Sequence, residues 1–378
     1  MKNSVKVDKQ YLLLKVLKTP AIILELTPSS WDLLVRQARV ANLLGHLYWL
    51  LIDSGLERDI PRQPKFHLES SASIAKRHAE AVRWEVEVLQ EALFDLGVPM
   101  VVLKGAAYIM AELPISRGRL FNDIDIMVPK SAISEVETRL VKWGWRTAHN
   151  SAYDQKYYRT WMHEIPPLKH STRQTVLDIH HSILPLTGKL VVDAGKLLTE
   201  SVQSKSATEI FWFQSVDMVL HSAAHLFHDG ELENGLRDLV DIDTLLKHFL
   251  SIDPNFYSNL YMRSNEMGLS EPLYYALYYC NALLSSEVDQ DVLEQLRKDN
   301  NFSKRVLIRD WLFLRALSPM HSSCSRLGDN VARFLLYLRS HYLRMPLRLL
   351  IPHLIHKAVL DKDKPFSKDL QRFIDNTE

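Results

Sequence analysis

The chain has 378 residues, enough for about two domains of ordinary size, and 47% of them are hydrophobic, so a sizeable core can form. Its 46 basic and 45 acidic residues give a formal charge of +1, which excludes a global attraction to nucleic acid but not a local basic cleft. The two cysteines, Cys280 and Cys324, lie far apart, so a disulfide framework or a cysteine zinc site is not expected and a reducing compartment is favoured.

The sequence predicts a protein without an integral membrane segment. Its first residues have no apolar signal-peptide region. The apolar stretch 41–52 contains His46 and is too short to cross a bilayer. We therefore expect a cytoplasmic protein.

Helical patterns dominate the N-terminal part of the chain. Apolar residues recur at helical spacing over residues 29–58, and residues 29–32 have the composition of a helix cap. Pro61 and Pro64 predict a turn or linker, because proline cannot continue a helix interior. A long amphipathic helix is expected over residues 71–96. Its predicted apolar stripe consists of Ile74, Ala81, Val82, Trp84, Val88, Leu89 and Leu93.

The middle third alternates between strand and helix signals, which predicts a mixed sheet. Helices are expected over residues 106–112 and from 131 to about 145, the second with a capping-box pattern at its start. Strands are expected at residues 100–103 and 124–128, around 153–159 and 162–170, and at 175–180.

From about residue 206 the pattern becomes almost wholly helical. The expected helices lie near residues 213–228, 236–250, 255–268, 271–285, 289–298, 302–317, 327–343 and 346–360, before a polar tail. The predicted fold class is α+β. A small mixed β-sheet core, residues 71–205, lies between an N-terminal helical region, residues 1–70, and a helical C-terminal domain, residues 206–378.

Two carboxylates one residue apart, Asp123 and Asp125, alternate with Ile124 and Ile126 in the second predicted strand. Since side chains alternate along a strand, both acids point to one face and both isoleucines to the core. Neighbouring carboxylates repel each other unless a positive charge lies between them, and oxygen ligands favour magnesium or manganese. Asp178 lies in a similar strand. Three carboxylates on adjacent strands can hold two metal ions, a geometry suited to in-line displacement at phosphorus.

The turn at Lys104 and Gly105 is a candidate phosphate site. It follows a predicted strand and precedes a helix, so its backbone N–H groups can meet phosphate oxygens. Gly105 allows the backbone to approach a ligand, and Lys104 adds a point charge. Arg117 and Arg119 precede the acidic strand and could clamp further phosphates with bidentate hydrogen bonds.

Together these segments resemble a known family. The runs LKG at 103–105, RLFNDIDIMV at 119–128 and LDIHH at 177–181 are similar to the DNA polymerase β-type nucleotidyltransferase superfamily, and most of all to its bacterial branch of uncharacterised nucleotidyltransferases. The resemblance covers roughly residues 72–250. It includes the stretch 162–168 and the histidine-containing segment 221–241.

The resemblance implies the chemistry of the site. Asp123, Asp125 and Asp178 would bind Mg²⁺ or Mn²⁺ and carry catalysis. A nucleoside monophosphate would pass from a nucleoside triphosphate to an acceptor, and pyrophosphate would be released. The core would accordingly have the nucleotidyltransferase fold.

The resemblance also implies that Lys104, Gly105 and Arg119 hold the triphosphate, since Arg119 matches the pattern of the branch and Arg117 does not. This chain departs from the pattern in two places. Lys104-Gly105 replaces the Gly-Ser or Gly-Gly pair of the wider superfamily, and His181 stands where the branch often has tryptophan.

Histidines form a second group of candidates. His163 and His180 are more typical of structural residues on half-buried strands, although His180 shares a strand face with Asp178 and could orient substrate. His221 and His225 are four residues apart on a predicted helix, a spacing that can bind zinc.

The pair His228-Asp229, with Asp238 or Asp241 nearby, is the pattern of a His-Asp metal phosphohydrolase. The resemblance instead makes this segment a helical wall of the nucleotide cleft, with Arg237 and Asp238 in a polar network.

Several alternatives stay open. The chain could be a non-catalytic nucleotide-binding or regulatory module, or a His-Asp phosphohydrolase. The sequence does not select the nucleotide, the oligomeric state, or the acceptor, which could be a protein, RNA or a small molecule.

The basic, leucine-rich stretch 333–357 is interpreted as a core-packing helix with a solvated basic face, in preference to a surface for a membrane or a partner.

Overall fold

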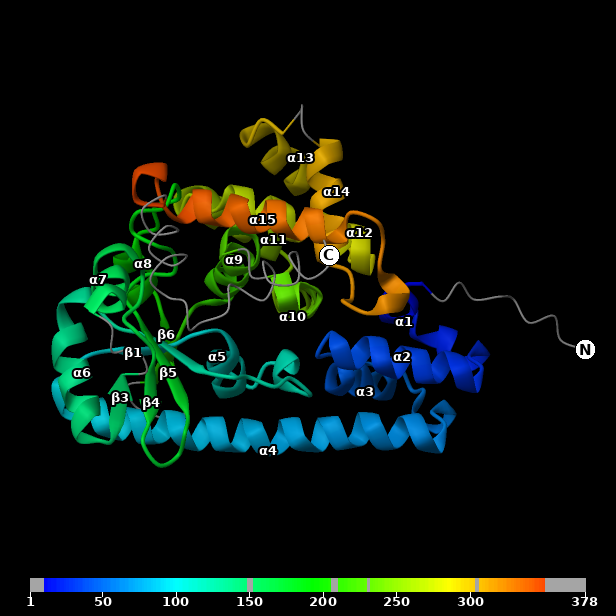
Figure 1. Ribbon diagram of the computed structural model, residues 1–378, viewed down its shortest axis with the longest axis horizontal. Coiled ribbons are helices and arrows are strands. Elements are labelled where there is room, and N and C mark those ends of the chain that lie inside the picture. The colour runs from blue at the N-terminus through cyan, green and yellow to red at the C-terminus, as the bar shows by residue number, and fades with distance from the viewer. Residues whose placement is uncertain (1–9, 148–151, 205–209, 230–231, 303–305, 351–378) are drawn as a thin grey trace, which may run out of the picture.

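The computed structural model describes residues 10–147, 152–204, 210–229, 232–302 and 306–350, and within them one mixed seven-stranded sheet joins a largely helical body (Figure 1). The strands are β1 (Met100–Val102), β2 (Ile124–Met127), β3 (Trp145–Thr147), β4 (Leu168–His170), β5 (Val176–His180), β6 (Val202–Gln203) and β7 (Ile210–Trp212). The α-helices are α1 (Leu12–Lys18), α2 (Pro28–Val40), α3 (Leu44–Asp53), α4 (Arg62–Leu93), α5 (Lys104–Met110), α6 (Ile133–Lys142), α7 (Ala152–Trp161), α8 (Ala194–Thr199), α9 (Ser215–Ala224), α10 (Gly235–Ile252), α11 (Phe256–Glu266), α12 (Ser270–Leu284), α13 (Gln290–Asp299), α14 (Val306–Ala316) and α15 (Asp329–Arg344).

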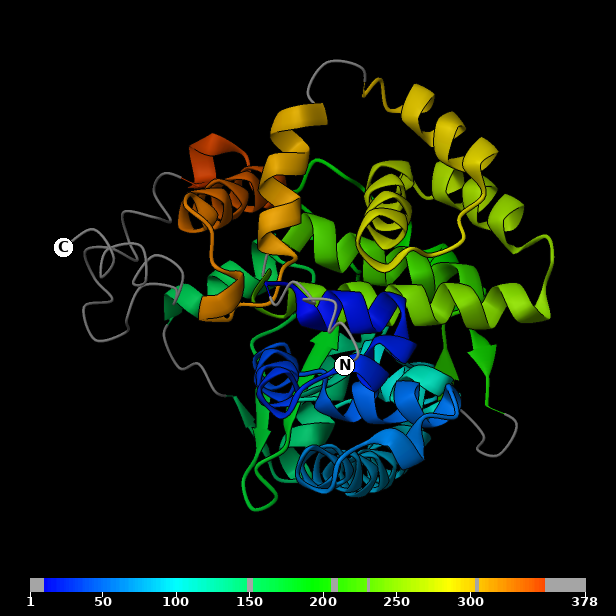
Figure 2. The ribbon, with the colours of Figure 1, turned by 90° about the vertical axis from the view of Figure 1, so that its right-hand side faces the viewer.

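The helices lie on opposite sides of the molecule. In Figure 1, α4 runs along the lower side beneath the sheet and beneath α2 and α3, and the helices from α9 to α15 lie above. Figure 2 shows the same arrangement with α4 seen nearly end-on. The mixed α/β architecture agrees with the predicted α+β class.

The sheet order is β3-β4-β5-β2-β1-β7-β6. Its central strand β2 pairs in parallel with β5 and antiparallel with β1, while β7 adds to the far edge of β1 in parallel. The predicted strands at β1, β2, β4 and β5 are thus confirmed. The structure places β2 and β5, which carry the candidate acids, side by side.

The long helix α4 begins earlier than the sequence predicts. It starts at Arg62 with Pro61 as its N-cap, so the linker expected at Pro61 and Pro64 is wrong. Proline is tolerated in the first turn of a helix, where the backbone N–H groups have no intrahelical partner. The helix also runs without a break through residue 70, the predicted boundary of the N-terminal region.

The predicted apolar stripe of α4 is only partly correct. Val82, Leu89 and Leu93 are buried, but Ile74 and Trp84 are 58% and 51% exposed. The helix packs against α2 and α3 at one end and against α5 and α6 at the other. A single stripe therefore cannot describe its buried residues.

The predicted helical segment 29–58 forms two helices, α2 and α3, with a break at residues 41–43. The cap lies earlier than expected, because the Thr27 hydroxyl accepts a hydrogen bond from the Ser30 backbone N–H. Gly45 of α3 packs directly on Gly118, so that a Cβ on either glycine would overlap the backbone of the other. This contact fixes the segment that leads to the acidic strand.

Two local predictions in the middle of the chain are wrong, and three short strands are missed. Residues predicted as a strand around 153–159 form the helix α7, in which Tyr153, Tyr157 and Trp161 contact one another at i,i+4 spacing. The capping box expected at residue 131 does not form, since α6 begins at Ile133 after a 3₁₀ turn. The short strands β3, β6 and β7 are not predicted from the sequence.

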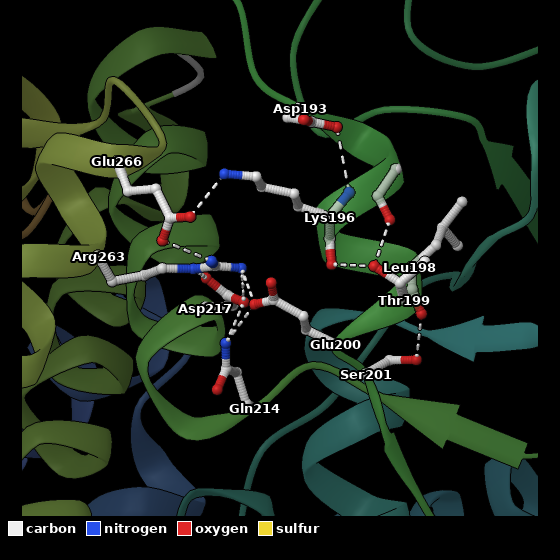
Figure 3. Close-up of polar contacts among 11 residues, drawn as sticks. Asp193, Lys196, Leu198, Thr199, Glu200, Ser201, Gln214, Asp217, Arg263 and Glu266 are labelled. Carbon is white, nitrogen blue, oxygen red and sulfur yellow. Dashed lines mark hydrogen bonds and ion pairs between the residues drawn. The ribbon is translucent and has the colours of Figure 1, made fainter.

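A buried polar network joins the sheet side to the C-terminal helices (Figure 3). The Arg263 guanidinium on α11 donates to both carboxylate oxygens of Asp217 on α9, at 2.8 and 2.9 Å. It also pairs with Glu266 and with Glu200, which follows α8, each at 2.8 Å. Three helical segments are thus held at one cation.

One hydrophobic cluster extends through all three predicted regions, from Leu12 in α1 to Leu336 in α15. Most helices predicted after residue 206 are confirmed, but residues 351–378, including Lys357 and the polar tail, lie outside the described residues. Arg339 on α15 donates to the Phe227 carbonyl at 2.7 Å and pairs with Glu271, so this basic residue packs inward. Among the described residues, none of the helices combines the length and the apolar character needed to cross a membrane.

Candidate active site

Asp123, Asp125 and Asp178 meet on one face of the central strands. Asp125 of β2 stands directly beside Asp178 of β5 in the parallel register, and Asp123 lies two residues earlier, exposed at the entry to β2. Ile124 and Ile126 point into the core and are 1% and 0% exposed. Alternation along the strand therefore brings the acids together, as the sequence predicts.

Two of the three acids are driven towards their protonated forms. Burial, and then the charges of Asp125 and Glu164, raise the pKa of Asp178 to about 8. Burial and the Asp125 charge also raise the pKa of Asp123. The buried Oδ1 of Asp178 has no hydrogen-bond partner among the described residues. A cation would stabilise this buried carboxylate, because a buried polar group without a hydrogen-bond partner is energetically costly.

Asp125 is held in its charged form. Its Oδ1 lies 2.9 Å from His180 Nε2 and 3.6 Å from Lys104 Nζ. Although burial alone would raise its pKa, these neighbours lower the pKa of the Asp125 carboxyl well below its usual range. Asp125 is thus the carboxyl of the acidic group that stays ionised.

Lys104 and Gly105 open the short helix α5, but they play different parts. Lys104 adopts a left-handed backbone conformation, with φ of 41°, and its ammonium faces Asp125. Gly105 faces the Phe121 ring, which a Cβ at this position would overlap. Packing against Phe121 therefore requires a glycine at this position. The sequence predicts only that Gly105 lets the backbone approach a ligand.

Arg119 is placed by carboxylates of α10. Its Nε donates to Asp241 at 2.5 Å, its guanidinium lies 3.6 Å from Asp238, and its Cζ lies 4.5 Å from the centre of the Phe121 ring. Arg237 also pairs with Asp238, at 2.7 Å, which confirms the predicted polar network.

Arg117 lies apart from this group. It forms a two-pronged pair with Asp53 on α3, at 3.1 and 3.2 Å, and stacks over Trp49. Arg119 therefore lies beside the acidic residues of α10 and Arg117 beside Asp53 of α3, while the predicted contact of Arg119 with a triphosphate stays a prediction.

His221 of α9 and His225, which directly follows α9, lie near the acidic group. The charge of His225 acts on Asp125, and His221 lines a small pocket with Lys104 and Tyr108. Burial, and then the Lys104 charge, lower the pKa of His221 well below its usual range, so this imidazole is neutral. His225 begins a π-helical turn, a feature that often marks functional sites.

His228, at the end of that turn, is buried with 1% exposure, and the side chain of Asp229 lies outside the described residues. Asp238 and Asp241, the other carboxylates of the phosphohydrolase alternative, pair with Arg119. No metal-ligating group that includes His228 occurs in the described part of the chain.

Sequence reasoning missed Glu164. The stretch 162–168 carried part of the resemblance, but Glu164 had no role in it. Its carboxylate lies 3.5 Å from His180 Nδ1, and its charge raises the pKa of Asp178. His181, which replaces a tryptophan of the resembling branch, is buried, and its backbone N–H donates to the His163 carbonyl at 2.8 Å.

The raised pKa of Asp178 predicts that divalent metal binding depends on pH. Asp178 must lose its proton to act as a ligand, so Mn²⁺ affinity should rise about tenfold per pH unit up to about pH 8 and then level off. Calorimetric titration with Mn²⁺ between pH 6 and 9 measures this. Asp178→Asn should flatten the slope, whereas Asp95→Asn, at a carboxylate 77% exposed, should keep it. A slope that is equal in wild type and Asp178→Asn would refute the assignment.

The same group links stability to pH in the metal-free protein. Because its pKa is higher in the folded state, Asp178 stabilises the fold fully below its unfolded pKa of about 4, and this contribution is lost as the pH rises through about 8. Asp178→Asn should therefore unfold at a higher temperature than wild type at pH 9.

Comparison with known proteins gives one family. The sequence model of the family described as "Uncharacterised nucleotidyltransferase" matches residues 27–285, about two thirds of the chain. The match begins before α2 and ends just after α12, so it is wider than the span of 72–250 expected from the motifs. Neither the curated proteins nor the solved structures give a significant match.

Proposed function

The chain belongs to the family of uncharacterised nucleotidyltransferases, and from this premise we propose that it moves a nucleoside monophosphate from a nucleoside triphosphate to an acceptor hydroxyl. The single observation that carries the proposal is the meeting of Asp125 and Asp178 in register, with Asp123 beside them and Lys104 opposite. We assign the sheet that carries them to the DNA polymerase β type.

The residues of the site fit a divalent cation. Asp123, Asp125 and Asp178 offer only carboxylate oxygens, the ligands that Mg²⁺ and Mn²⁺ prefer, and Asp178 Oδ1 is buried without a hydrogen bond. Magnesium bound there would share the developing negative charge and lower the pKa of the acceptor hydroxyl.

In the proposed reaction the acceptor oxygen attacks the α-phosphorus, and the bond from that phosphorus to the bridging oxygen of the β-phosphate breaks. Pyrophosphate leaves with the electron pair of that bond. Asp178, ionised beside the bound metal, helps to take the proton of the acceptor hydroxyl. Asp125, held ionised by Lys104 and His180, keeps its charge throughout.

We assign the triphosphate to the side of Lys104, Gly105 and Arg119. Lys104 lies 3.6 Å from Asp125, so its ammonium can bridge between that acid and a phosphate. A phosphate near Arg119 would compete with Asp238 and Asp241 for the guanidinium. Nucleotide binding could in this way loosen the contact between the acidic strand and α10.

Labelled nucleotides test the proposal. The protein is incubated with each α-³²P-labelled triphosphate, magnesium and a cell lysate, and the labelled products are separated by size and by nuclease and protease sensitivity. We expect one nucleotide to label one class of acceptor, whether protein, RNA or small molecule, with an equal amount of pyrophosphate. No labelling and no pyrophosphate with any nucleotide would favour a non-catalytic binding module. The need for a nucleoside triphosphate and magnesium fits the cytoplasmic location expected from the sequence.

A further inference from the structure

Three side chains next to Asp125 form a second group with metal-ligating chemistry. One ligand atom each from His163, Glu164 and His180 lies within 4.8 Å of the others. In the described part of the chain, no other set of three His, Cys, Asp or Glu ligand atoms lies this close together, and those of Asp123, Asp125 and Asp178 are further apart. Its donors include two imidazoles, unlike the all-carboxylate group formed by Asp123, Asp125 and Asp178.

The backbone fixes the three residues relative to one another. Glu164 and His180 form an antiparallel bridge, and the Ile165 N–H donates to the Ile179 carbonyl at 3.0 Å. The His181 N–H donates to the His163 carbonyl at 2.8 Å. The rings of His163 and His180 lie 5.3 Å apart. His163 and Glu164, in the segment between α7 and β4, are therefore held against His180 at the end of β5.

The hydrogen bond of His180 to Asp125 decides which of its nitrogens can bind a metal. An ionised carboxylate only accepts hydrogen bonds, so His180 Nε2, 2.9 Å from Asp125 Oδ1, carries the proton. His180 Nδ1 then faces Glu164 Oε2 at 3.5 Å. In the neutral imidazole, the lone pair of Nδ1 faces the Glu164 carboxylate. The separation of 3.5 Å is too long for a hydrogen bond. His180 Nδ1 is buried and has no hydrogen-bond partner among the described residues.

The spacing suits two ligands of one ion. Ligand atoms about 2.1 Å from a tetrahedral zinc ion lie roughly 3.4 Å apart, close to the observed separation of Nδ1 and Oε2. A set of two histidines and one glutamate is typical of zinc, and it leaves a fourth position open. Imidazole nitrogen disfavours magnesium, so the two neighbouring sites would select different ions.

We propose that His163, Glu164 and His180 bind one zinc-class transition-metal ion beside the acidic site. The ion would hold His180 in the tautomer that donates from Nε2 to Asp125. A metal-bound histidine commonly donates its other N–H to a carboxylate, and that partner fixes the orientation of the ring. His180 is then a positioning residue for Asp125. Only this last role rests on the proposed nucleotidyl transfer, since metal binding itself does not.

Cobalt(II) tests the site without any nucleotide. The metal-stripped Asp123→Asn/Asp178→Asn protein, which keeps Asp125, is titrated with Co²⁺ alone. We expect about one equivalent to bind, with visible d–d bands typical of low-coordinate nitrogen ligation, and Zn²⁺ to displace it. Glu164→Gln and His163→Gln in the same background should weaken Co²⁺ binding at least about 100-fold. His67→Gln, an exposed histidine of α4, should leave it unchanged.

Two outcomes would overturn the proposal. One is the absence of d–d bands in this background, with Co²⁺ bound only when Asp123 and Asp178 are intact. The other is unchanged Co²⁺ affinity in folded Glu164→Gln, which would exclude Glu164 as a ligand. Circular dichroism of each variant separates misfolding from ligand loss. Because no nucleotide is present, a negative result leaves labelled-nucleotide transfer as an independent test of the proposed function.

Discussion

Asp125→Asn is expected to reduce nucleotidyl transfer at least about 10³-fold, measured as kcat/KM for pyrophosphate release at saturating magnesium. Asp125 lies beside Asp178 and contacts both Lys104 and His180, so its charge acts on every part of the proposed site. Asparagine keeps the volume and an oxygen that can accept from His180. The loss therefore reports the charge of a metal ligand, not a packing defect.

Three further variants locate the chemistry. Asp123→Asn should abolish transfer as well, whereas Asp95→Asn, the same change at an exposed carboxylate, should leave it intact. Full transfer by a folded Asp125→Asn protein would contradict the carboxylate site. If a metal-dependent activity survives Asp123→Asn and is lost in His228→Ala, the His-Asp phosphohydrolase is the correct assignment instead.

Arg263→Met should lower the free energy of unfolding by about 3–5 kcal/mol, the usual cost of removing one partner of a buried ion pair. Asp217 is 2% exposed and Arg263 is 7% exposed. Methionine would leave the Asp217 carboxylate buried with only the 3.0 Å hydrogen bond from Gln214 (Figure 3). Urea unfolding followed by circular dichroism measures the change.

Matched variants separate burial from charge. Lys196→Met, which removes the exposed end of the same network, should scarcely shift the urea midpoint, because exposed pairs are weak. Arg263→Met/Asp217→Leu should recover much of the loss, since replacing a buried pair by apolar residues is often neutral. An Arg263→Met midpoint equal to that of wild type would show that the network contributes no stability.

The acidic site was predictable because its signal is local. Asp123 and Asp125 share a face through the two-residue period of a strand, and Asp178 lies in a second strand of the same kind. That these strands are neighbours required the sheet order, which places β5 beside β2 although more than forty residues separate them in the sequence. The pairing of Asp125 with Asp178 is therefore a tertiary result.

The partners of the site could not be predicted, because each comes from a distant segment. Arg119 meets Asp241 across 122 residues, and Asp125 meets His180 across 55. Glu164 had no recognisable pattern, and only the bridge to His180 gives it a place near the acids. The sequence predicts His221 and His225 as a separate cluster, and only the fold brings them near Lys104 and Asp125.

The sequence by itself determined which acids are candidates for the site, since alternation along one strand and the identity of three acids are local properties. It also determined most helices, because the helical spacing of apolar residues belongs to each segment and does not depend on a particular tertiary contact. It misassigned α7, where aromatic residues suit both strands and helices, and the start of α4, where proline is tolerated. The tertiary structure decided which carboxyl is held charged, which is driven towards its protonated form and which histidine nitrogen faces Glu164. These properties depend on burial and on charges from remote segments, and no local pattern records them.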